Sequence, residues 1–424
     1  MVLERVKKLE TLFSKYEITA AELAKVKALE EKLVNSEMTV SVIGQFKRGK
    51  STMVNAILQE KIMPVGIVPV TAVNTSVRYG EKSARVHFEN GAVVETPFEE
   101  VTAYINEQEN NDNKLGVAGV EMHVPAEFLK SGITLVDTPG VGSIHKNNTD
   151  AAYAFVKESD AVIFLLSVDS PINQIEIEFL ERTKAYASKF YFAVNKADIV
   201  DEDELEDYLA YCKMLLCKLM EVDSVTLFPV SAKKNIGVQE MLAVVESDCK
   251  AQAKEIIEGS VNLKLKDIVE SALRQITLYR TALNMPMDEF AGKFEEMKAA
   301  FDGFKKDAAD FAGHFANNSS MLQAELNTTK NRLSAKVSEL FGIEYHYDIA
   351  SVELGDEVEQ AEEVSGELNG EIFLSEVEKL CDELFETLNV IFMYREENAY
   401  TVVRRINDLN RLVRSLATMR EELK

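Results

Sequence analysis

The segment that most constrains this chain is 44–51, which reads GQFKRGKS. An apolar, β-branched run precedes it and a run of helix formers follows it, so the sequence predicts a loop between a buried strand and a helix. Two glycines let backbone N–H groups surround phosphate oxygens, Lys50 brings a positive charge, and the Ser51 hydroxyl is suited to ligate Mg²⁺. We therefore predict a phosphate-binding loop (P-loop) rather than a glycine turn without a ligand. Its predicted binding residues are Gly44, Gly49, Lys50, Ser51 and Thr52.

The composition narrows the class of protein. The chain has 424 residues, of which 46% are hydrophobic, so it is long enough for two or three domains with full cores. Its formal net charge of −24 at pH 7 disfavours broad binding to nucleic acid or anionic lipid, which would repel it. The charged start is unlike a signal peptide, and no apolar run reaches the length of a membrane span. We expect a cytoplasmic protein that binds no nucleic acid and contacts a membrane at most peripherally.

The domain organisation follows from hydrophobic patterning. Residues 38–250 alternate apolar, strand-like runs with helical patterns. The runs are too apolar to have a wet face, which predicts an α/β fold with a mostly parallel sheet covered by helices on both faces. Beyond this region only one of the eight prolines occurs and long runs of helix formers appear, so an almost purely helical part is predicted. Residues 1–37 also have helical spacing, with a break near 17–19. The clearest strand-like runs are 133–136, 161–166 and 190–194.

In the helical part, apolar residues recur at spacings of four and three, which is typical of helices packed along a seam. We interpret this stripe as the core of an intramolecular bundle, with a dimer seam as the alternative. Pro286 is predicted to end the helix before it. Residues 337–378 contain no Lys or Arg and many carboxylates, so a solvated acidic connector is predicted near 345–370. The stripe consists of Phe290, Phe294, Met297, Phe301, Phe304, Ala308, Phe311 and Phe315.

Three further motifs follow strand-like runs. In 137–140 (DTPG), Asp137 is suited to hold Mg²⁺ through water, and the Gly140 N–H to meet a γ-phosphate. In 195–198 (NKAD), the Asp198 carboxylate can accept hydrogen bonds from N1–H and N2–H₂ of guanine, whereas adenine has an acceptor at N1. The backbone of 231–233 (SAK) is suited to contact guanine O6. These motifs predict a guanine nucleotide, GTP or GDP, bound with Mg²⁺ by residues that include Asn195, Lys196, Ser231, Ala232 and Lys233.

With these motifs in this order, the chain resembles GTPases of the dynamin superfamily, most of all the bacterial dynamin-like proteins. The resemblance is specific in the first 250 residues and one of layout beyond them. It implies GTP hydrolysis and a switch segment at 69–72 (PVTA), whose Thr71 closes onto Mg²⁺; Thr75 is the alternative. The implied metal ligands are then Ser51, Thr71 and Asp137. The resemblance also implies that 38–250 form the GTPase domain, that 1–37, 251–285 and 396–424 form one bundle, and that 286–395 form a helical stalk.

Two positions depart from related GTPases. Phe46 stands where eukaryotic dynamins have a water-orienting glutamine, and Val141 where small GTPases have one. Lys47 occupies the position of an internal arginine finger in the similar guanylate-binding proteins and atlastins, and Arg48 is next to it. Either side chain is suited to neutralise charge that develops on the phosphates. The alternative is a solvated pair on a loop. The predicted catalytic residues are Lys47, Arg48, Lys50, Thr71 and Gly140.

Taken with the resemblance, the sequence predicts a GTP-hydrolysing protein that self-associates through its GTPase domains and moves its stalk, in membrane remodelling. Related remodelling proteins carry an apolar paddle where this chain has an acidic connector, so membrane contact is expected to be indirect. A second dynamin-like protein or a membrane adaptor is the expected partner. The alternative is a soluble regulatory GTPase or assembly scaffold that acts through a protein partner. An ATP-dependent enzyme is disfavoured by Asp198.

Overall fold

The computed structural model describes residues 1–423 apart from 46, 66–72, 89, 107–109, 111–114, 139–155, 316–318 and 347–361. The chain divides into two compact units, which we call the sheet unit and the helical unit. The sheet unit contains Met1–Val6 and Lys27–Lys264, and the helical unit contains Lys7–Val26 and Leu265–Lys424. The helices α1 (Val2–Phe13), α2 (Ala20–Asn35) and α8 (Val238–Asn284) contribute residues to both units.

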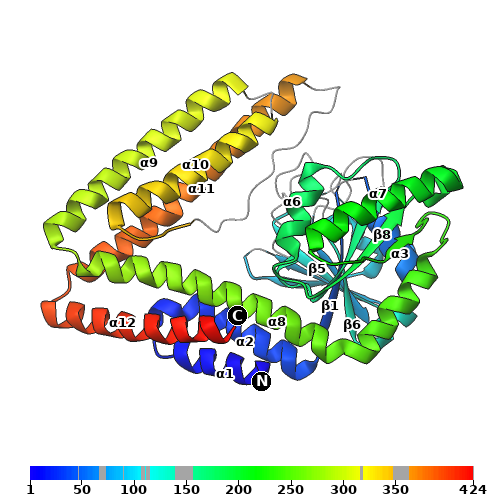
Figure 1. Cartoon of the computed structure of the whole chain (residues 1–424), viewed down its shortest axis with the longest axis horizontal. Coiled ribbons are helices and arrows are strands. Elements are labelled where there is room, and N and C mark those ends of the chain that lie inside the picture. Colours follow the sequence, from blue (N-terminus) through cyan, green and yellow to red (C-terminus); the bar gives the residue numbers. More distant parts are fainter. Residues whose placement is uncertain are drawn as a thin grey trace. The chain divides into compact units, whose positions relative to one another are not determined.

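Within the described residues, nine strands form one sheet in the order β4-β3-β5-β2-β6-β1-β7-β8-β9 (Figure 1). The five strands from β6 to β9 in this order are parallel to their neighbours. Every residue of β6 and β7 is buried, which explains why their sequences are continuous apolar runs. The predicted mostly parallel sheet is confirmed. These strands are β1 (Met38–Ile43), β6 (Ile133–Asp137), β7 (Ala161–Ser167), β8 (Lys189–Asn195) and β9 (Leu227–Pro229).

The other four strands form a flank of mixed direction that the sequence patterns did not reveal, in which β2 and β5 are parallel to each other. β3 pairs antiparallel with β4 and β5, and β2 pairs antiparallel with β6. In β3 the buried residues Ala84 and Val86 alternate with exposed ones, so one face packs inward and the other meets water. Short alternating runs of this kind are weaker signals than continuous apolar runs. These strands are β2 (Thr75–Tyr79), β3 (Ser83–Phe88), β4 (Val93–Thr96) and β5 (Val117–Val124).

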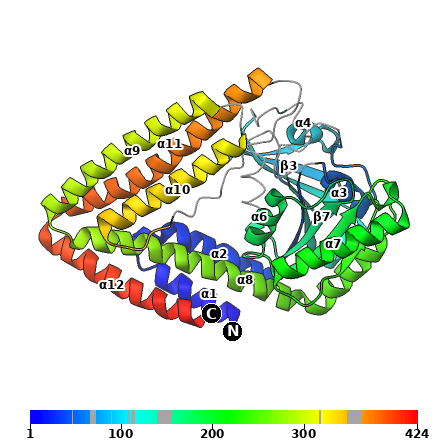
Figure 2. The same ribbon diagram turned by 45° about the horizontal axis from the view of Figure 1, so that its top comes forward.

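Helices pack against the sheet in both ribbon views (Figures 1 and 2). α3 contacts β1 and β6, and buries Met53, Val54 and Ile57. The ring centroid of Phe179 on α6 lies 6.5 Å from that of Phe164 on β7, so α6 packs on the parallel part of the sheet. The helices of this unit include α3 (Lys50–Leu58), α4 (Thr102–Ile105), α6 (Gln174–Thr183) and α7 (Glu202–Met220), with short 3₁₀ segments at Phe98–Glu100, Glu127–Ser131 and Ala197–Ile199.

A buried carboxylate immediately before β7 joins two helices to the sheet. Asp160 is 0% exposed and accepts hydrogen bonds from the Thr39 backbone, at 2.8 Å, and from the Ser260 hydroxyl. The ammonium groups of Lys32 on α2 and Lys264 on α8 lie 2.7 and 3.2 Å from its two oxygens. Burial lowers the pKa of Lys264 to about 8, while Asp160 opposes the shift. One carboxylate thus anchors α2 and α8 at the amino end of β7.

The helical unit contains a stalk made of α9, α10 and α11, which lie side by side in Figures 1 and 2 and contact one another. The phenylalanine stripe lies inside the stalk. Phe290 is 0% exposed, and its ring centroid lies 6.1 to 6.3 Å from those of Phe294, Phe341 and Phe392. The predicted intramolecular core is confirmed. The helices are α9 (Met287–Phe315), α10 (Ser319–Phe341), α11 (Glu362–Arg395) and α12 (Ala399–Glu422).

The end of α8 is held by a residue from the end of α11. α8 ends at Asn284, as expected from the proline two residues later. The Arg395 guanidinium donates to the carbonyl oxygens of Ala282 and Leu283, at 2.9 and 2.7 Å. These carbonyls belong to the last turn of a helix, which leaves its carbonyl groups without intrahelical partners. Arg395 therefore caps α8 from a position more than a hundred residues away in sequence.

Two details of the helical prediction need correction. α8 is not regular throughout, because Gln252 has φ of −126° and ψ of 15°. α11 begins at Glu362, inside the range 345–370 that was expected to be a connector. Its sequence there contains several Glu and Leu, which are good helix formers even where the charge is high. The remaining connector residues, 347–361, lie outside the described residues.

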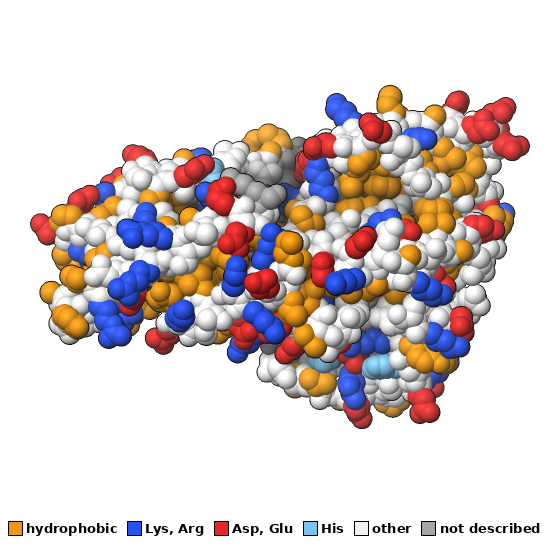
Figure 3. All heavy atoms as spheres, turned by 60° about the horizontal axis from the view of Figure 1, so that its bottom comes forward, with side chains coloured by type: hydrophobic (Ala, Val, Ile, Leu, Met, Phe, Trp, Pro, Cys, Tyr) orange, Lys and Arg blue, Asp and Glu red, His pale blue; other side chains and the backbone are white. Residues whose placement is uncertain are grey.

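The surface of the described residues is mixed in character. On the face shown in Figure 3, charged side chains of both signs lie among apolar ones. In the described part of the chain, no helix combines the length and the apolar character that crossing a membrane requires.

Replacing Phe290 by Ala is expected to destabilise the stalk by about 3 to 5 kcal/mol, because truncating a fully buried Phe loses apolar contacts and leaves a cavity. Urea unfolding of the full chain, followed by circular dichroism, measures the loss. Lys306→Ala, at an exposed position of the same helix, is the control and should change little. A midpoint that rises with protein concentration would instead indicate a dimer seam.

Candidate nucleotide-binding site

The P-loop lies at the carboxyl end of β1, between β6 and β7. Contacts with neighbouring groups require both of its glycines. A Cβ atom on Gly44 would lie 2.6 Å from the carbonyl oxygen of Leu165, and one on Gly49 would lie 2.5 Å from Nδ2 of Asn195. Gly49 also has φ of +93°, in the left-handed region. α3 begins at the next residue, so the unpaired N–H groups of its first turn are available to an anion at the loop.

Two charged groups are buried at this end of the site, Lys50 of the loop and Asp137 at the end of β6. The Lys50 ammonium donates to the Gln45 carbonyl oxygen at 3.2 Å, and burial lowers the pKa of Lys50 to about 8. Asp137 ends β6 and is 0% exposed. Burial raises the pKa of Asp137 to about 6, an effect that the Ser51 hydroxyl and Lys50 partly offset. Each group therefore lies where its charged form lacks water and gains from an opposite charge.

The surroundings of Asp137 fit a bound cation. Among the described residues, neither carboxylate oxygen of Asp137 makes a hydrogen bond of good geometry. A buried carboxylate without donors is costly, and a hydrated Mg²⁺ is a partner of the right charge and ligand preference. Ser51, in the first turn of α3, supplies a hydroxyl next to Lys50. Thr52 follows it and is half-buried.

Thr75, the alternative to Thr71 as a metal ligand, lies close to Asp137 in the sheet. Thr75 begins β2 and is the register partner of Asp137 in the antiparallel pair of β2 and β6, so the two side chains lie on the same face. The Thr75 hydroxyl is buried and has no hydrogen-bond partner among the described residues. Thr75 therefore stays an alternative to Thr71. Thr71, Gly140, Phe46 and Val141 lie outside the described residues.

Arg48 is buried, with 2% of its surface exposed, and its guanidinium group is engaged on several sides. It forms a bidentate ion pair with Glu176, at 2.7 and 2.6 Å. It also donates to the carbonyl oxygens of Ser170 and Pro171, at 3.0 and 3.1 Å. Glu176 and Asn173 form the capping box that starts α6. The buried guanidinium group of Arg48 thus links the P-loop to α6.

Lys47 has different surroundings from its neighbour. Its φ of +65° lies in the left-handed region, which changes the direction of the chain between the two basic residues. Its side chain is exposed, and its carbonyl oxygen accepts a hydrogen bond from the Lys196 ammonium at 3.0 Å. Of the two candidates for charge stabilisation, Lys47 is the one on the accessible side of the loop.

Asn195 joins the P-loop to the predicted base-binding segment. Its Nδ2 donates to the carbonyl oxygen of Arg48 at 2.8 Å, and its Oδ1 accepts from the backbone N–H of Ala232 at 3.0 Å. Asn195 is only 3% exposed, so these bonds form away from water. Lys196 adds a second connection through Lys47 and through an ion pair with Asp169. The phosphate-binding and base-binding segments are therefore held together by one short stretch at the end of β8.

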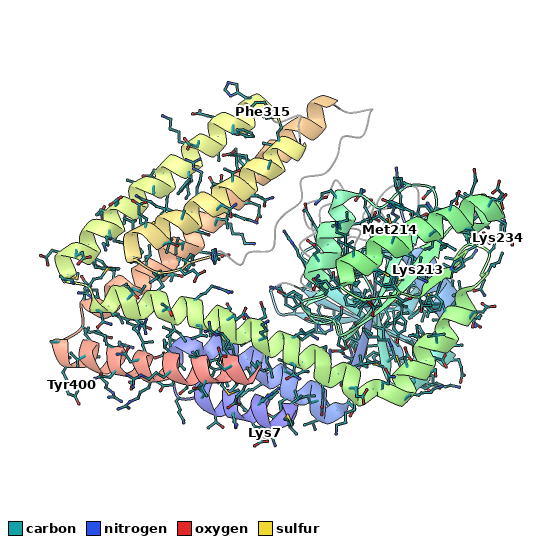
Figure 4. The ribbon with its side chains drawn as sticks, in the orientation of Figure 1. Lys7, Lys213, Met214, Lys234, Phe315 and Tyr400 are labelled. Carbon is teal, nitrogen blue, oxygen red and sulfur yellow. The ribbon has the colours of Figure 1, made fainter. Side chains whose placement is uncertain are left out.

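Asp198 and the segment 231–233 lie together after β8 and β9. The Lys234 ammonium lies 3.0 Å from a carboxylate oxygen of Asp198. Hydrogen bonding by Ser231 and Lys234 lowers the pKa of Asp198, which keeps the carboxylate ionised, as an acceptor for guanine must be. Ser231 and Ala232 are buried, whereas Lys233 and Lys234, the latter labelled in Figure 4, are exposed.

The structure brings most of the predicted residues together around the P-loop, and it adds four that the motifs did not indicate. Asn173 and Glu176 were predictable from the sequence, because their spacing is that of a capping box. Asp169 and Lys234 had no such signal: nothing in the sequence distinguishes Lys234 from Lys233 as the partner of Asp198.

Comparisons with known proteins agree with the motifs. Residues 40–198 match the model of the Dynamin family. Over 241 residues the chain is 34% identical to a protein of Caldicellulosiruptor sp. (strain Rt8B.4) described as an uncharacterized protein in the xynA 3′ region, covering 57% of this chain and 60% of that protein. Over 259 residues it is 26% identical to dynamin-like protein A of Bacillus subtilis (strain 168), covering 58% of this chain and 21% of that protein.

Among solved structures, the chain resembles one described as "An oligomerised bacterial dynamin pair provides a mechanism for the long range sensing and tethering of membranes". The identity is 17% and the TM-score 0.44, over 99% of this chain and 79% of that chain. The matches to the two relatives span less than two thirds of each relative's own length. The region matched by the family model contains the P-loop, Asp137 and the motif 195–198. The resemblance drawn from the motifs is confirmed for residues 40–198, which match the model of the Dynamin family.

Proposed function

We propose that this protein binds GTP with Mg²⁺ and hydrolyses it to GDP and phosphate. The observation that carries the proposal is the position of Asn195, whose side chain bonds the P-loop backbone and the Ala232 backbone at once. A nucleotide spans these two segments, with its phosphates at the first and its base at the second. The match of residues 40–198 to the Dynamin family supports the same activity.

The phosphate end of the site is built for a polyanion with a metal ion. Lys50 is buried and its pKa is lowered, so a phosphate beside it would stabilise its charged form. We propose that Ser51, Thr71 and Asp137 hold Mg²⁺, Asp137 through water, and that the Gly140 N–H meets the γ-phosphate. The ion, when bound, would neutralise charge on the β- and γ-phosphates.

The base end is proposed to select guanine through Asp198, with the backbone of 231–233 at O6. In the structure the Asp198 carboxylate is paired with Lys234, an exposed side chain that can move away. Guanine would then take the position of that ammonium group and donate N1–H and N2–H₂ to the carboxylate.

Asp198→Asn is expected to weaken GTP binding about tenfold or more, because a donor would replace one acceptor and a mispaired buried polar group costs about 1 to 3 kcal/mol. Competition of GTP, XTP and ATP against a fluorescent guanine nucleotide measures the preference. Asp203→Asn, at an exposed carboxylate five residues further on, is the matched control. An unchanged order of the three nucleotides in Asp198→Asn would refute the guanine assignment.

Hydrolysis needs charge stabilisation on the phosphates, and we propose Lys47 for it. Arg48 has its donors committed to Glu176 and to backbone carbonyl groups, whereas Lys47 lies exposed on the same loop. Phe46 and Val141 leave the loop without the water-positioning glutamines of related GTPases. We propose that docking of a second GTPase domain aims Lys47 and orders the switch segment, and that this self-association is coupled to movement of the stalk.

Lys47→Ala is expected to keep GDP affinity but to lose the rise of turnover per molecule with protein concentration. Arg48→Gln is expected to act differently, because it leaves Glu176 buried without its partner. Losing one member of such a pair costs about 3 to 5 kcal/mol, so the thermal midpoint and GDP affinity should both fall.

The double variant Arg48→Gln/Glu176→Gln separates the two roles. It removes both charges and should recover part of the stability lost in Arg48→Gln. GTP turnover measured over a range of protein concentrations, together with thermal unfolding, tests all three variants. A flat turnover per molecule in the wild type, unaltered by Lys47→Ala, would contradict the proposed docking.

We propose that the protein acts in membrane remodelling from the cytoplasm, through a second dynamin-like protein or a membrane adaptor. Segment 337–378 has many carboxylates and no Lys or Arg, and the chain as a whole has a formal net charge of −24. Anionic lipid would repel such a chain, and each basic residue that it lacks there would have contributed about 1 kcal/mol of attraction. The competing function is a soluble regulatory switch or assembly scaffold that acts on a protein partner.

The fraction of protein that sediments with phosphatidylcholine liposomes is expected to be small and not to rise as phosphatidylserine is added, with or without GTP. Sedimentation over a series of phosphatidylserine contents makes the measurement. Strong pelleting that grows with anionic lipid would overturn the indirect route and favour direct membrane action. Recruitment to liposomes after addition of a second dynamin-like protein would favour remodelling over the soluble switch.

A further inference from the structure

The helical unit contains a pocket of about 350 Å³ where four of its segments meet. The segments are the turn between α1 and α2, the last part of α8, the end of α11 and the beginning of α12. This volume falls in the usual range of small-molecule sites, about 300 to 1,000 Å³. Its lining includes Lys15, Tyr16, Glu17, Tyr279, Tyr394, Arg404, Arg405 and Asp408.

The basic side chains of the pocket are not equivalent. Arg405 is committed, because it bonds Glu397 in two places, at 2.8 and 2.6 Å, and lies 4.0 Å from the ring centroid of Tyr394. Lys15 and Arg404 are exposed at the rim and form no ion pair with any described residue. The pocket therefore offers two cations that are available to an anionic group.

The pocket also has an acidic and aromatic side. Glu17 and Asp408 contribute carboxylates, and Asp408 has only a distant partner, Arg411, at 3.9 Å. The rings of Tyr279 and Tyr394 lie 6.3 Å apart. Tyr279 is 5% exposed, so its hydroxyl lies where there is little water. Burial raises the pKa of Tyr279 to about 12, so this hydroxyl is a neutral donor.

A ligand with a single charge would leave half of this lining unmatched. An anion alone would lie beside Glu17 and Asp408, and a cation alone beside Lys15 and Arg404. A molecule with both charges matches the basic and the acidic side chains. Its ammonium group would be attracted by the aromatic rings in addition to the carboxylates. Phosphate suits the arginine, because a guanidinium group bonds phosphate oxygens in pairs.

We propose that this pocket binds a small phosphate ester that also bears an amine, of the phosphoethanolamine type. The phosphate is held by Arg404 and Lys15, and the amine by Asp408, Glu17 and the ring of Tyr279. The ligand is either a free metabolite or the head group of a lipid, which share this chemistry. Because it contacts all four segments, it stabilises their arrangement at the junction of the stalk with α8 and α12.

The test uses the full chain with O-phosphoethanolamine as the probe, followed by titration calorimetry and by thermal unfolding. We expect saturable binding and a rise of the unfolding midpoint. Glycerol 3-phosphate lacks the amine and ethanolamine lacks the phosphate, and each should bind about tenfold more weakly or worse. Vesicles of phosphatidylethanolamine, compared with phosphatidylglycerol vesicles, distinguish a lipid source from a soluble one.

Variants assign the two ends of the ligand. Arg404→Gln should weaken binding about tenfold or more without changing the unfolding midpoint of the free protein, because Arg404 is exposed. Arg414→Gln, an exposed arginine of the same helix outside the pocket, is the matched control. Asp408→Asn should reduce the affinity for O-phosphoethanolamine to that for glycerol 3-phosphate.

Three results would each overturn the proposal. The first is no saturable binding of either O-phosphoethanolamine or phosphatidylethanolamine vesicles. The second is equal binding by Arg404→Gln and Arg414→Gln. The third is equal affinity of the wild type for glycerol 3-phosphate and O-phosphoethanolamine, which would remove the role of the amine. Binding to phosphatidylethanolamine vesicles alone supports the proposal with the lipid as the source.

Discussion

The buried ion pair of Arg48 and Glu176 fixes the shape of the site. Removing two charges from water is costly, and the cost is offset here because the guanidinium finds several oxygens and the carboxylate also closes the cap of α6. The pair ties the P-loop to the end of β7 and to the start of α6. The ion pair also fixes one side of the P-loop. The neighbouring residue, Lys47, lies on the other side of the loop, where its side chain is exposed.

β7 connects this pair to a second buried charge. Ser167 ends the strand and its carbonyl oxygen accepts a hydrogen bond from Arg48 at 3.3 Å. Asp160 precedes the strand and holds Lys32 and Lys264, which lie on two different helices. Both ends of one fully buried strand are therefore in contact with charged groups from outside the sheet. Any change in the P-loop that moved β7 would be felt by α2 and α8 through Asp160.

Local patterns in the sequence were sufficient for the parts of the fold that depend on neighbouring residues. The P-loop, the continuous apolar strands and the phenylalanine stripe were predictable because each is a pattern of residue types within one continuous stretch of sequence. The flank formed by β2 to β5 was not predictable, since Ala84 and Val86 of β3 alternate with polar residues over too few positions. The cap that Arg395 places on α8 and the partner of Asp198 depend on residues that meet only in the folded chain. The side chain of Lys47 is exposed and that of Arg48 is buried because the backbone of Lys47 is left-handed. The residue types at these positions do not indicate that conformation.

The two units are interleaved in the sequence, and this has a consequence for synthesis. The segment Lys7–Val26 belongs to the helical unit, but the rest of that unit begins at Leu265, about 240 residues later. At about 5 to 20 residues per second, the ribosome takes roughly 12 to 48 s to make the intervening chain. During that time the buried residues of this segment, Leu9, Phe13 and Val26 among them, have no partners. Until Leu265 and later residues are made, the apolar sides of the amphipathic helices in Lys7–Val26 lack their partners in the rest of the helical unit, so the order of translation is part of the folding problem.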